Sequence, residues 1–356
     1  MARIGIIGTG WGARTQVPVF RESGLDVVAI AGHSREKTEN TAAALGLKPI
    51  TDWRDLIELD LDLVSIVTPP SEHLEMARAA LDAGKHVICE KPTASHANEA
   101  ESLVVAARSN AGQIAIIDHE LRFLPSWLEA RRRVPDLGVR YFEIRYASPA
   151  RGERLREWTW WSDAASGGGI WGAVGSHFVD AIRYLAGGID SVQALLSTII
   201  RERPAASEEK GQPRHLRKVT SDDFSVVNLR LRNGVLATMS CSVVASGPDE
   251  PAMITIHGEN GALRLVGEEL LFASRGVPFE RIAGNEQAKR PGNSSGGAFG
   301  SGTYYLGAAL KSALDDDNPE ALAPAATFED GLEQQRVLDA ARRSNANGGH
   351  WEDLPR

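Results

Sequence analysis

The first residues with the spacing of a binding motif form a glycine-rich turn. Residues 8–13 read Gly-Thr-Gly-Trp-Gly-Ala and follow the apolar run Ile4–Ile7 directly. In a Gly-x-Gly-x-x-Gly/Ala turn, the first glycine permits a tight bend and the second lets the backbone approach a pyrophosphate. The small last residue lets the next helix pack closely, and the N–H groups that begin this helix attract phosphate. The pattern predicts a dinucleotide site built from Gly8, Thr9, Gly10, Trp11, Gly12 and Ala13.

The end of the next expected strand bears on which dinucleotide fits. An acid there binds the ribose 2′-hydroxyl of NAD, whereas a basic residue accommodates the 2′-phosphate of NADP. This chain has no acid at that place and reads His33-Ser34-Arg35. Ser34 can donate to a phosphate, and Arg35 can make a charge-assisted contact or stack on the adenine. We therefore predict a preference for NADP, with NAD as second choice; the alternative is that Arg35 is a solvated first-turn residue.

Two further motifs lie where expected strands end, which is where ligands of open α/β sheets bind. Thr68-Pro69-Pro70 precedes His73, and Glu90-Lys91-Pro92 ends the next strand. Lys91 could hydrogen-bond a substrate hydroxyl and stabilise it as its proton leaves. The alternatives are a plain strand stop for the first motif and an ordinary ion pair in the second. The cofactor-binding candidates are then His33, Ser34, Arg35, Thr68, Pro69, Pro70, His73, Glu90, Lys91 and Pro92.

The later part of the chain gathers tryptophans, glycines and arginines that could meet a substrate. Three successive glycines, 167–169, mark a place where backbone passes close to a ligand or another segment. Trp160 and Trp161 could stack on a sugar ring or on nicotinamide, and are equally compatible with a core role. Arg122 could hold an anionic group of the substrate. Arg151 and Arg154 could do the same, although a solvated surface position is favoured for both.

The elements that would position these residues follow a regular order in the first third of the chain. Short apolar strands alternate with helices at a spacing that predicts a doubly wound parallel sheet with right-handed crossovers. The expected strands are Ile4–Ile7, Asp26–Ala31, Leu63–Val67, His86–Cys89 and Gln113–Ile117. The expected helices are Gly12–Ser23, Arg35–Leu45, Trp53–Ile57, Glu72–Ala83 and Ala97–Ser109.

A different pattern begins after residue 121 and predicts an α+β domain with an open, mostly antiparallel sheet. Asn233-Gly234 and Asn260-Gly261 between apolar runs are hairpin signals. Lys289–Gly302 is rich in glycine and serine and is typical of a linker, or of a lid. We expect strands at Arg140–Ala147, Val192–Ile200, Asp223–Arg232, Val235–Val244, Ala252–His257, Ala262–Leu265 and Leu270–Ser274. We expect helices at Ser176–Leu185, Tyr304–Leu314 and Phe328–Arg343.

Length and composition limit the class of protein. The chain has 356 residues, which favours two domains, here 1–121 and 122–356, with a C-terminal helix that could pack back on the first. A net charge of −8 argues against nucleic-acid binding. Cys89 and Cys241 have no metal-binding spacing, so no metal is expected. No apolar run is long enough to span a membrane, and a cytoplasmic location is the expectation.

These motifs together resemble those of a known family. The glycine turn, Thr-Pro-Pro-x-x-His at 68–73 and Cys-Glu-Lys-Pro at 89–92 occur in the order and spacing of the glucose–fructose oxidoreductase, inositol dehydrogenase and rhizopine-catabolism (Gfo/Idh/MocA) family. Arg122-Phe123-Leu124-Pro125 is similar to that family's Arg-Phe-x-Pro segment. The resemblance implies a Rossmann domain followed by an α+β domain whose sheet often joins subunits. It also implies that Lys91 is the active-site lysine.

The resemblance implies a role for His177 as well, and one departure from the family pattern. His177, in the first turn of the helix expected from Ser176, looks like the family's general acid/base. Asp180 could orient its ring, although a structural role such as pairing with Arg183 is favoured. The family usually has an Asp four residues before this His, where this chain has Ala173. That change resembles the glucose–fructose oxidoreductase domain-containing subgroup and leaves Lys91 and His177 as the catalytic candidates.

The function that follows is hydride transfer between a nicotinamide and a secondary alcohol or carbonyl of a sugar, cyclitol or related polyol. Two alternatives stay open: a non-catalytic NAD(P)-binding sensor, and a redox-cycling lyase or hydrolase that keeps its cofactor tightly bound. Retention of Lys91 and His177 argues against a pure sensor. A small-molecule substrate and a homodimer or homotetramer, formed through the C-terminal sheet, complete the expectation.

Overall fold

The computed structural model describes residues 1–205, 215–284 and 297–355, and the chain divides into two compact units. Unit 1 comprises Met1–Ala94, Asn98–Leu128 and Asn285–Leu332; unit 2 comprises Ser95–Ala97, Glu129–Gly284 and Glu333–Arg356. The boundary expected after residue 121 remains a prediction. Among the described residues, no helix combines the length and hydropathy needed to cross a bilayer.

Unit 1 contains a seven-stranded sheet in the order β17-β6-β5-β4-β1-β2-β3. Six strands run parallel and β17 is antiparallel to β6. This confirms the predicted doubly wound parallel sheet. Fully buried β-branched and leucine side chains on β1 and β4 form the centre of its core. The strands are β1 Arg3–Ile7, β2 Asp26–Ala31, β3 Lys48–Ile50, β4 Leu63–Ile66, β5 His86–Cys89, β6 Ala115–Ile117 and β17 Ala326–Thr327.

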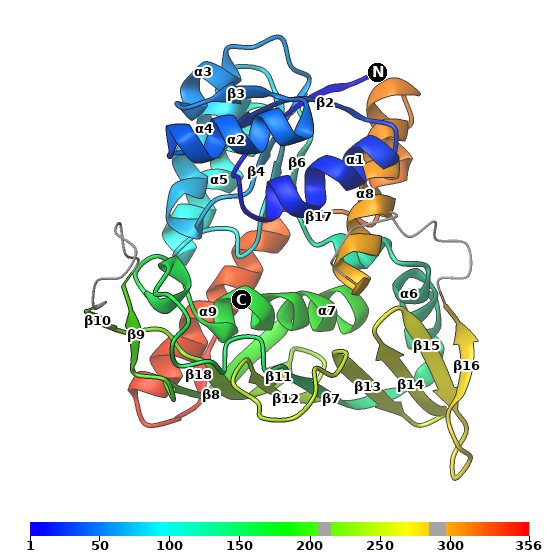
Figure 1. Cartoon of the computed structure of the whole chain (residues 1–356). Coiled ribbons are helices and arrows are strands. Elements are labelled where there is room, and N and C mark those ends of the chain that lie inside the picture. Colours follow the sequence, from blue (N-terminus) through cyan, green and yellow to red (C-terminus); the bar gives the residue numbers. More distant parts are fainter. Residues whose placement is uncertain (206–214, 285–296, 356) are drawn as a thin grey trace. The chain divides into compact units, whose positions relative to one another are not determined.

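Helices connect these strands, and α1 and α8 pack against each other (Figure 1). The first crossover begins with a five-residue π-helix, η1 (Gly12–Gln16), which continues into α1 with Pro18 in its first turn. The others are α1 Val17–Glu22, α2 Arg35–Leu45, α3 Trp53–Ile57, η2 Pro70–Glu72, α4 His73–Asp82, α5 Ala97–Ser109, η3 Glu120–Phe123, α8 Gly297–Asp315 and η6 Pro319–Leu322. Two helices have residues in both units: α6 Pro125–Leu137 and α9 Phe328–Ala346.

Helix α8 begins earlier than the helix predicted from Tyr304. Residues 289–296 of the expected linker or lid lie outside the described residues, but residues 297–302 form the first turns of α8. The reason lies in packing: a Cβ on Gly302 would come within 2.7 Å of the Glu120 carbonyl oxygen. Glycine there permits a close approach to η3 that propensity alone does not favour.

Unit 2 contains a nine-stranded sheet in the order β16-β15-β14-β13-β7-β12-β11-β8-β18. Only β7 and β12 pair in parallel, so the sheet is mostly antiparallel, as predicted. Buried and exposed residues alternate along β7, β11 and β12. The strands are β7 Val139–Ala147, β8 Ile189–Ser197, β11 Phe224–Leu231, β12 Leu236–Ser242, β13 Met253–Gly258, β14 Gly261–Val266, β15 Glu269–Ala273, β16 Glu280–Ala283 and β18 Glu352–Asp353.

One face of this sheet is covered by α7 (Ser176–Ala186), where the rings of Phe178 and Tyr146 lie 6.3 Å apart (Figure 1). The π-helix η5 (Trp171–Gly175) precedes α7 directly. A two-stranded ribbon, β9 Glu202–Pro204 with β10 Leu216–Lys218, and the short helix η4 (Trp160–Ser162) complete the unit. The segment that carries His177 is therefore fixed on the sheet by its own helix.

Candidate functional site

The motifs of unit 1 form a row along one edge of its sheet. Backbone bonds continue the parallel ladder past the strand ends: Gly8 N donates to Ala31 O, and Glu90 N donates to Ile66 O, both at 2.9 Å. Asp118 N donates to Cys89 O at 2.7 Å. Because these strands are parallel, their carboxyl ends lie at the same edge. The glycine turn, Thr68–Pro70, Glu90–Lys91 and Asp118 are thus brought together.

Gly8 and Gly10 have opposite surroundings within the turn. Gly8 has a φ of +133°, and a Cβ there would lie 2.2 Å from the Val67 carbonyl oxygen. Gly10 has no heavy atom within 4 Å of such a Cβ, so its backbone faces open space. Gly12 also packs closely on the first strand, since its Cβ would lie 2.7 Å from Ile6. The turn therefore combines a rigid base with an open backbone that fits a pyrophosphate.

The residues after β2 are exposed, and each has a local partner. Ser34 is the N-cap of α2 and accepts from Lys37 N at 3.4 Å. Arg35 lies 3.5 Å from Glu39 on the surface of that helix. His33 Nε2 lies 3.5 Å from the Glu72 carboxylate. None of these contacts is strong, so all three side chains remain available to an adenosine ribose.

His73 lies behind the edge rather than on it. Its side chain is fully buried, with Nε2 3.0 Å from the Thr68 carbonyl oxygen and Nδ1 3.2 Å from that of Thr93. Burial lowers the pKa of His73, which favours a neutral ring that donates to one carbonyl at a time. The ring thus connects the Thr68–Pro70 motif with the segment after Lys91 and Pro92, whose peptide bond is cis.

The carboxyl groups of Glu90, Asp118 and Glu120 lie close to one another and near Lys91. Asp118 and Glu120 are almost fully buried, and Asp118 interacts with Glu90 on the neighbouring strand. Gln16 Nε2 donates to Asp118 Oδ2 at 2.8 Å, and Ser65 donates to Gln16 Oε1 at 2.6 Å. Burial raises the pKa of all three carboxyl groups, well above the usual range for Asp118 and Glu120, while the charge of Lys91 opposes the shift.

In unit 2, the three-glycine segment fits tightly against another loop. A Cβ on Gly168 would lie 2.5 Å from the Trp161 carbonyl oxygen, and Gly169, at φ +108°, would clash with Asp222 at 2.4 Å. Asp222 accepts from Trp171 N at 2.7 Å and so holds the first turn of η5. Burial raises the pKa of Asp222 to about 6. The glycines thus allow close packing of the segment that precedes η5 and His177.

His177 and Asp180 lie in the first turns of α7, and both are buried. Gln334 Nε2 donates to the Ser176 carbonyl oxygen at 2.7 Å, which fixes the start of this helix against α9. Arg183 lies 3.6 Å from the Glu333 carboxylate. Ala173 is buried in η5.

The remaining substrate candidates have defined neighbours. The rings of Trp160 and Trp161 lie 6.3 Å apart, and the Arg151 guanidinium stacks 3.8 Å above Trp161. Both rings are partly exposed, so they can meet a ligand. Arg122 is almost fully buried and donates to Asp330 at 3.2 Å. Its guanidinium therefore has a structural contact within unit 1.

Sequence reasoning did not find the carboxyl cluster or the role of Asp222. Asp118 and Glu120 directly follow the strand expected at 113–117, and acids at a strand end could have been the signal. Asp222 precedes an expected strand and gave no signal by its type or spacing. Among the described residues, no group of three His, Cys, Asp or Glu side chains could hold a metal ion.

Comparison with known proteins gives matches over both units. Residues 2–118 match the family described as oxidoreductase family, NAD-binding Rossmann fold, and residues 138–264 match the GFO/IDH/MocA C-terminal domain. The glucose-fructose oxidoreductase domain-containing protein 2 of Bos taurus is 30% identical over 98% of this chain and 92% of its own length.

Solved structures agree with this result. An oxidoreductase domain protein from Kribbella flavida superimposes with a TM-score of 0.85 at 28% identity, covering all of both chains. Levoglucosan dehydrogenase in complex with NADH and L-sorbose has a TM-score of 0.87 at 23% identity, over 100% of this chain and 99% of the other. At that identity the second likeness shows the shared fold.

Proposed function

Since the chain belongs to the Gfo/Idh/MocA oxidoreductase family, we propose that it transfers hydride between a nicotinamide and a substrate carbon. That carbon would be a secondary alcohol or carbonyl of a sugar, cyclitol or related polyol. Support comes from the edge of unit 1, where the glycine turn and Lys91 lie on the same row of strand ends. A dinucleotide along this row would have its pyrophosphate at the turn and its reactive end toward Lys91.

The residues present fit such a cofactor. The open space at Gly10 and the N–H groups of η1 would hold the pyrophosphate, and His33–Arg35 would meet the adenosine ribose. Thr68–Pro70 and Glu90–Pro92 would contact the rest of the dinucleotide further along the edge. When bound, the nicotinamide supplies the hydride acceptor or donor.

The chain's own residues would then hold the substrate and move its proton. Oxidation of an alcohol releases the hydroxyl proton, which a base must accept, and reduction of a carbonyl needs it returned. We assign Lys91 to the substrate oxygen, whose developing negative charge its ammonium would stabilise. We assign the proton to His177, because an imidazole changes charge near neutral pH. Asp180 and the partly exposed rings of Trp160 and Trp161 are proposed as substrate neighbours.

The choice between NAD and NADP is a separate proposal. NADH is the cofactor named for levoglucosan dehydrogenase, and the family description names NAD binding. The residues directly after β2, Gly32–Arg35, include no acid, and the exposed Arg35 side chain could meet a 2′-phosphate. We propose that the chain binds both NAD(H) and NADP(H). Contacts from Ser34 and Arg35 to the 2′-phosphate would make NADP(H) the preferred cofactor.

The open face of the nine-stranded sheet supports a proposal about assembly. Large apolar side chains on β7, β8 and β12 are exposed there, among them Tyr141, Leu195 and Leu236. Exposed apolar groups that recur over several strands are typical of protein interfaces. We propose that two or four copies of the chain associate through this sheet.

The test begins with binding of NADH and NADPH to the purified chain, followed by reduced-nicotinamide absorbance with a panel of sugars and cyclitols. We expect turnover with at least one polyol, reduced at least 100-fold in Lys91→Ala and His177→Ala. Lys48→Ala and His350→Ala are matched controls, since both side chains are exposed, and should retain activity. Tight cofactor binding without turnover on any substrate would overturn the dehydrogenase proposal.

A further inference from the structure

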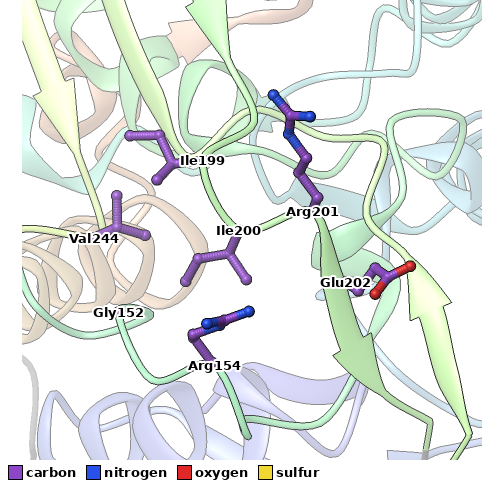
Figure 2. A pocket seen from close by; sticks show the side chains of 7 residues that line it. All are labelled: Gly152, Arg154, Ile199, Ile200, Arg201, Glu202 and Val244. Atoms are coloured by element: carbon purple, nitrogen blue, oxygen red, sulfur yellow. The ribbon is translucent and has the colours of Figure 1, made fainter.

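Unit 2 contains a pocket outside the segment that carries His177. Its volume is about 500 Å³, and three separate segments line it: the loop after β7, the connection from β8 into the first residue of β9, and the chain that follows β12. Figure 2 shows Ile199 and Val244 at one end, with Arg201 and Glu202 at the other and Arg154 beside Ile200. The pocket is lined by Gly152, Arg154, Ile199, Ile200, Arg201, Glu202 and Val244.

Several arginine side chains lie in and around this pocket. Among the described residues, the guanidinium groups of Arg154 and Arg201 form no hydrogen bond or ion pair, and Glu202 is the one acid in the lining. The loop that carries Arg154 is itself held by arginine. Arg203 donates to the Glu153 carbonyl oxygen at 2.8 Å and to that of Arg151 at 2.6 Å.

These contacts use backbone carbonyls rather than carboxylates, and Asp223 is the acid that attracts the charge of Arg203. Arg156 likewise donates to the Ala150 carbonyl oxygen at 2.8 Å. Removal from water, together with the like charges of Arg156 and Arg203, lowers the pKa of Arg151 to about 9. Arg151 and Arg203 thus carry positive charge in a partly desolvated place, which would attract an anion to the pocket beside them.

We propose that this pocket binds the phosphate or carboxylate group of an anionic sugar derivative. Arg154 and Arg201 would hold the anionic group, because guanidinium forks match the oxygens of phosphate and carboxylate. Ile199, Ile200 and Val244 would contact the carbon skeleton. That the ligand is a sugar derivative rests on the proposed function, whereas recognition of the anion does not.

The pocket wall is connected to the candidate catalytic segment of the same unit. The Asp223 carboxylate accepts from Ile199 N at 2.7 Å and from Ile200 N at 2.8 Å. The preceding residue, Asp222, accepts from Trp171 N at 2.7 Å at the start of η5. Two consecutive residues therefore hold the pocket wall and the turn that leads to His177.

The test is titration calorimetry on the full chain without any nicotinamide, with glucose 6-phosphate, gluconate and glucose as ligands. We expect one or both anions to bind and glucose not to bind at the same concentration. Arg154→Ala and Arg201→Ala should each weaken anion binding about tenfold or more. Arg275→Ala, which removes an exposed arginine elsewhere in unit 2, should have no effect.

Each outcome separates this proposal from the proposed function. Binding of glucose 6-phosphate alone or gluconate alone, weakened in Arg154→Ala and Arg201→Ala, supports the site and identifies the group that it recognises; binding that both variants retain would place the anion elsewhere and overturn the proposal. Equal binding of glucose, absence of binding by either anion, or unchanged affinity in the double variant Arg154→Ala, Arg201→Ala overturns it. Because no turnover is measured, an inactive chain that binds the anion would contradict the dehydrogenase while supporting the site.

Discussion

The two units treat buried charge in opposite ways. In unit 1, three carboxyl groups gather near Lys91, and their removal from water raises the pKa of each. In unit 2, several arginines gather near a pocket, and burial lowers the pKa of Arg151 and Arg203. Desolvation disfavours the charged form in both places. The type of side chain then decides whether the buried group can lose its charge.

A carboxyl group can become neutral by accepting a proton, whereas a guanidinium at neutral pH remains charged. The acidic cluster of unit 1 can therefore relieve its own repulsion by holding protons beside Lys91. The arginine group of unit 2 keeps its charge, so it depends on opposite charge such as that of Asp223 or of an anion bound in the pocket. The first arrangement suits proton handling, and the second suits ligand binding, which is why we propose different roles for the two regions.

The largest effect should come from the backbone that supports unit 1. In Gly8→Ala, the new Cβ would lie 2.2 Å from a backbone oxygen, at a φ of +133° that L-residues rarely adopt. We expect a loss of more than about 3 kcal/mol in the free energy of unfolding, measured by urea denaturation. Gly169→Ala, its counterpart in unit 2, should lose somewhat less, because its closest clash, at 2.4 Å, is with the Asp222 side chain rather than with backbone, although moving that side chain would break its bond to Trp171 N.

Gly46→Ala is the control for this prediction. Gly46 also has a positive φ, +63°, but no heavy atom lies within 4 Å of the added Cβ. Its cost should be about 1 kcal/mol. Equal destabilisation by Gly8→Ala and Gly46→Ala would contradict the close packing of the glycine turn against Val67.

A smaller effect should follow from neutralising the acidic cluster by Asp118→Asn. The raised pKa of Asp118 means that the folded state holds a proton which the unfolded chain loses above about pH 4. The free energy of unfolding of the original chain should therefore fall as the pH rises from about 4 to the raised pKa of Asp118. The Asn variant lacks this loss because an amide does not titrate, and its oxygen can still accept from Gln16. We expect it to be more stable at pH 8 by about 1–2 kcal/mol, and nearly equal at pH 4.

Asp118→Ala shows whether charge or packing is responsible. It removes the acceptor of Gln16 and should lower stability at both pH values by about 1–3 kcal/mol. Thermal denaturation at pH 4, 6 and 8 measures all three proteins. A lower stability of Asp118→Asn at pH 8 would mean that the ionised carboxylate is stabilised by Lys91, and the cluster would not hold the proton that we infer.

The sequence predicts those elements whose cause lies within a few neighbouring residues, and it does not predict those that depend on distant packing. The parallel sheet and the Gly8 turn follow from short apolar runs and from a glycine pattern that acts within one turn. Helix α6 was missed, since Pro125 and Pro135 suggest breaks, although they stand at its start and in its last turn. The cluster of Glu90 with Asp118 depends on the pairing of Cys89 with Ile117, which no local pattern reveals. The early start of α8 likewise depends on distant packing.

The smallest effect should come from Arg35→Ala, just after β2, which tests the preference between NADPH and NADH. Arg35 is three-quarters exposed, and surface pairs such as Arg35 with Glu39 contribute at most about 1 kcal/mol, so Arg35→Ala should barely change stability. If Arg35 meets a 2′-phosphate, the variant should bind NADPH about three- to tenfold more weakly and NADH equally well. Lys37→Ala removes an equal exposed charge two residues away and controls for long-range attraction. Tighter binding of NADH than NADPH by the original chain, with no change in Arg35→Ala, would show that the missing acid after β2 does not select NADP.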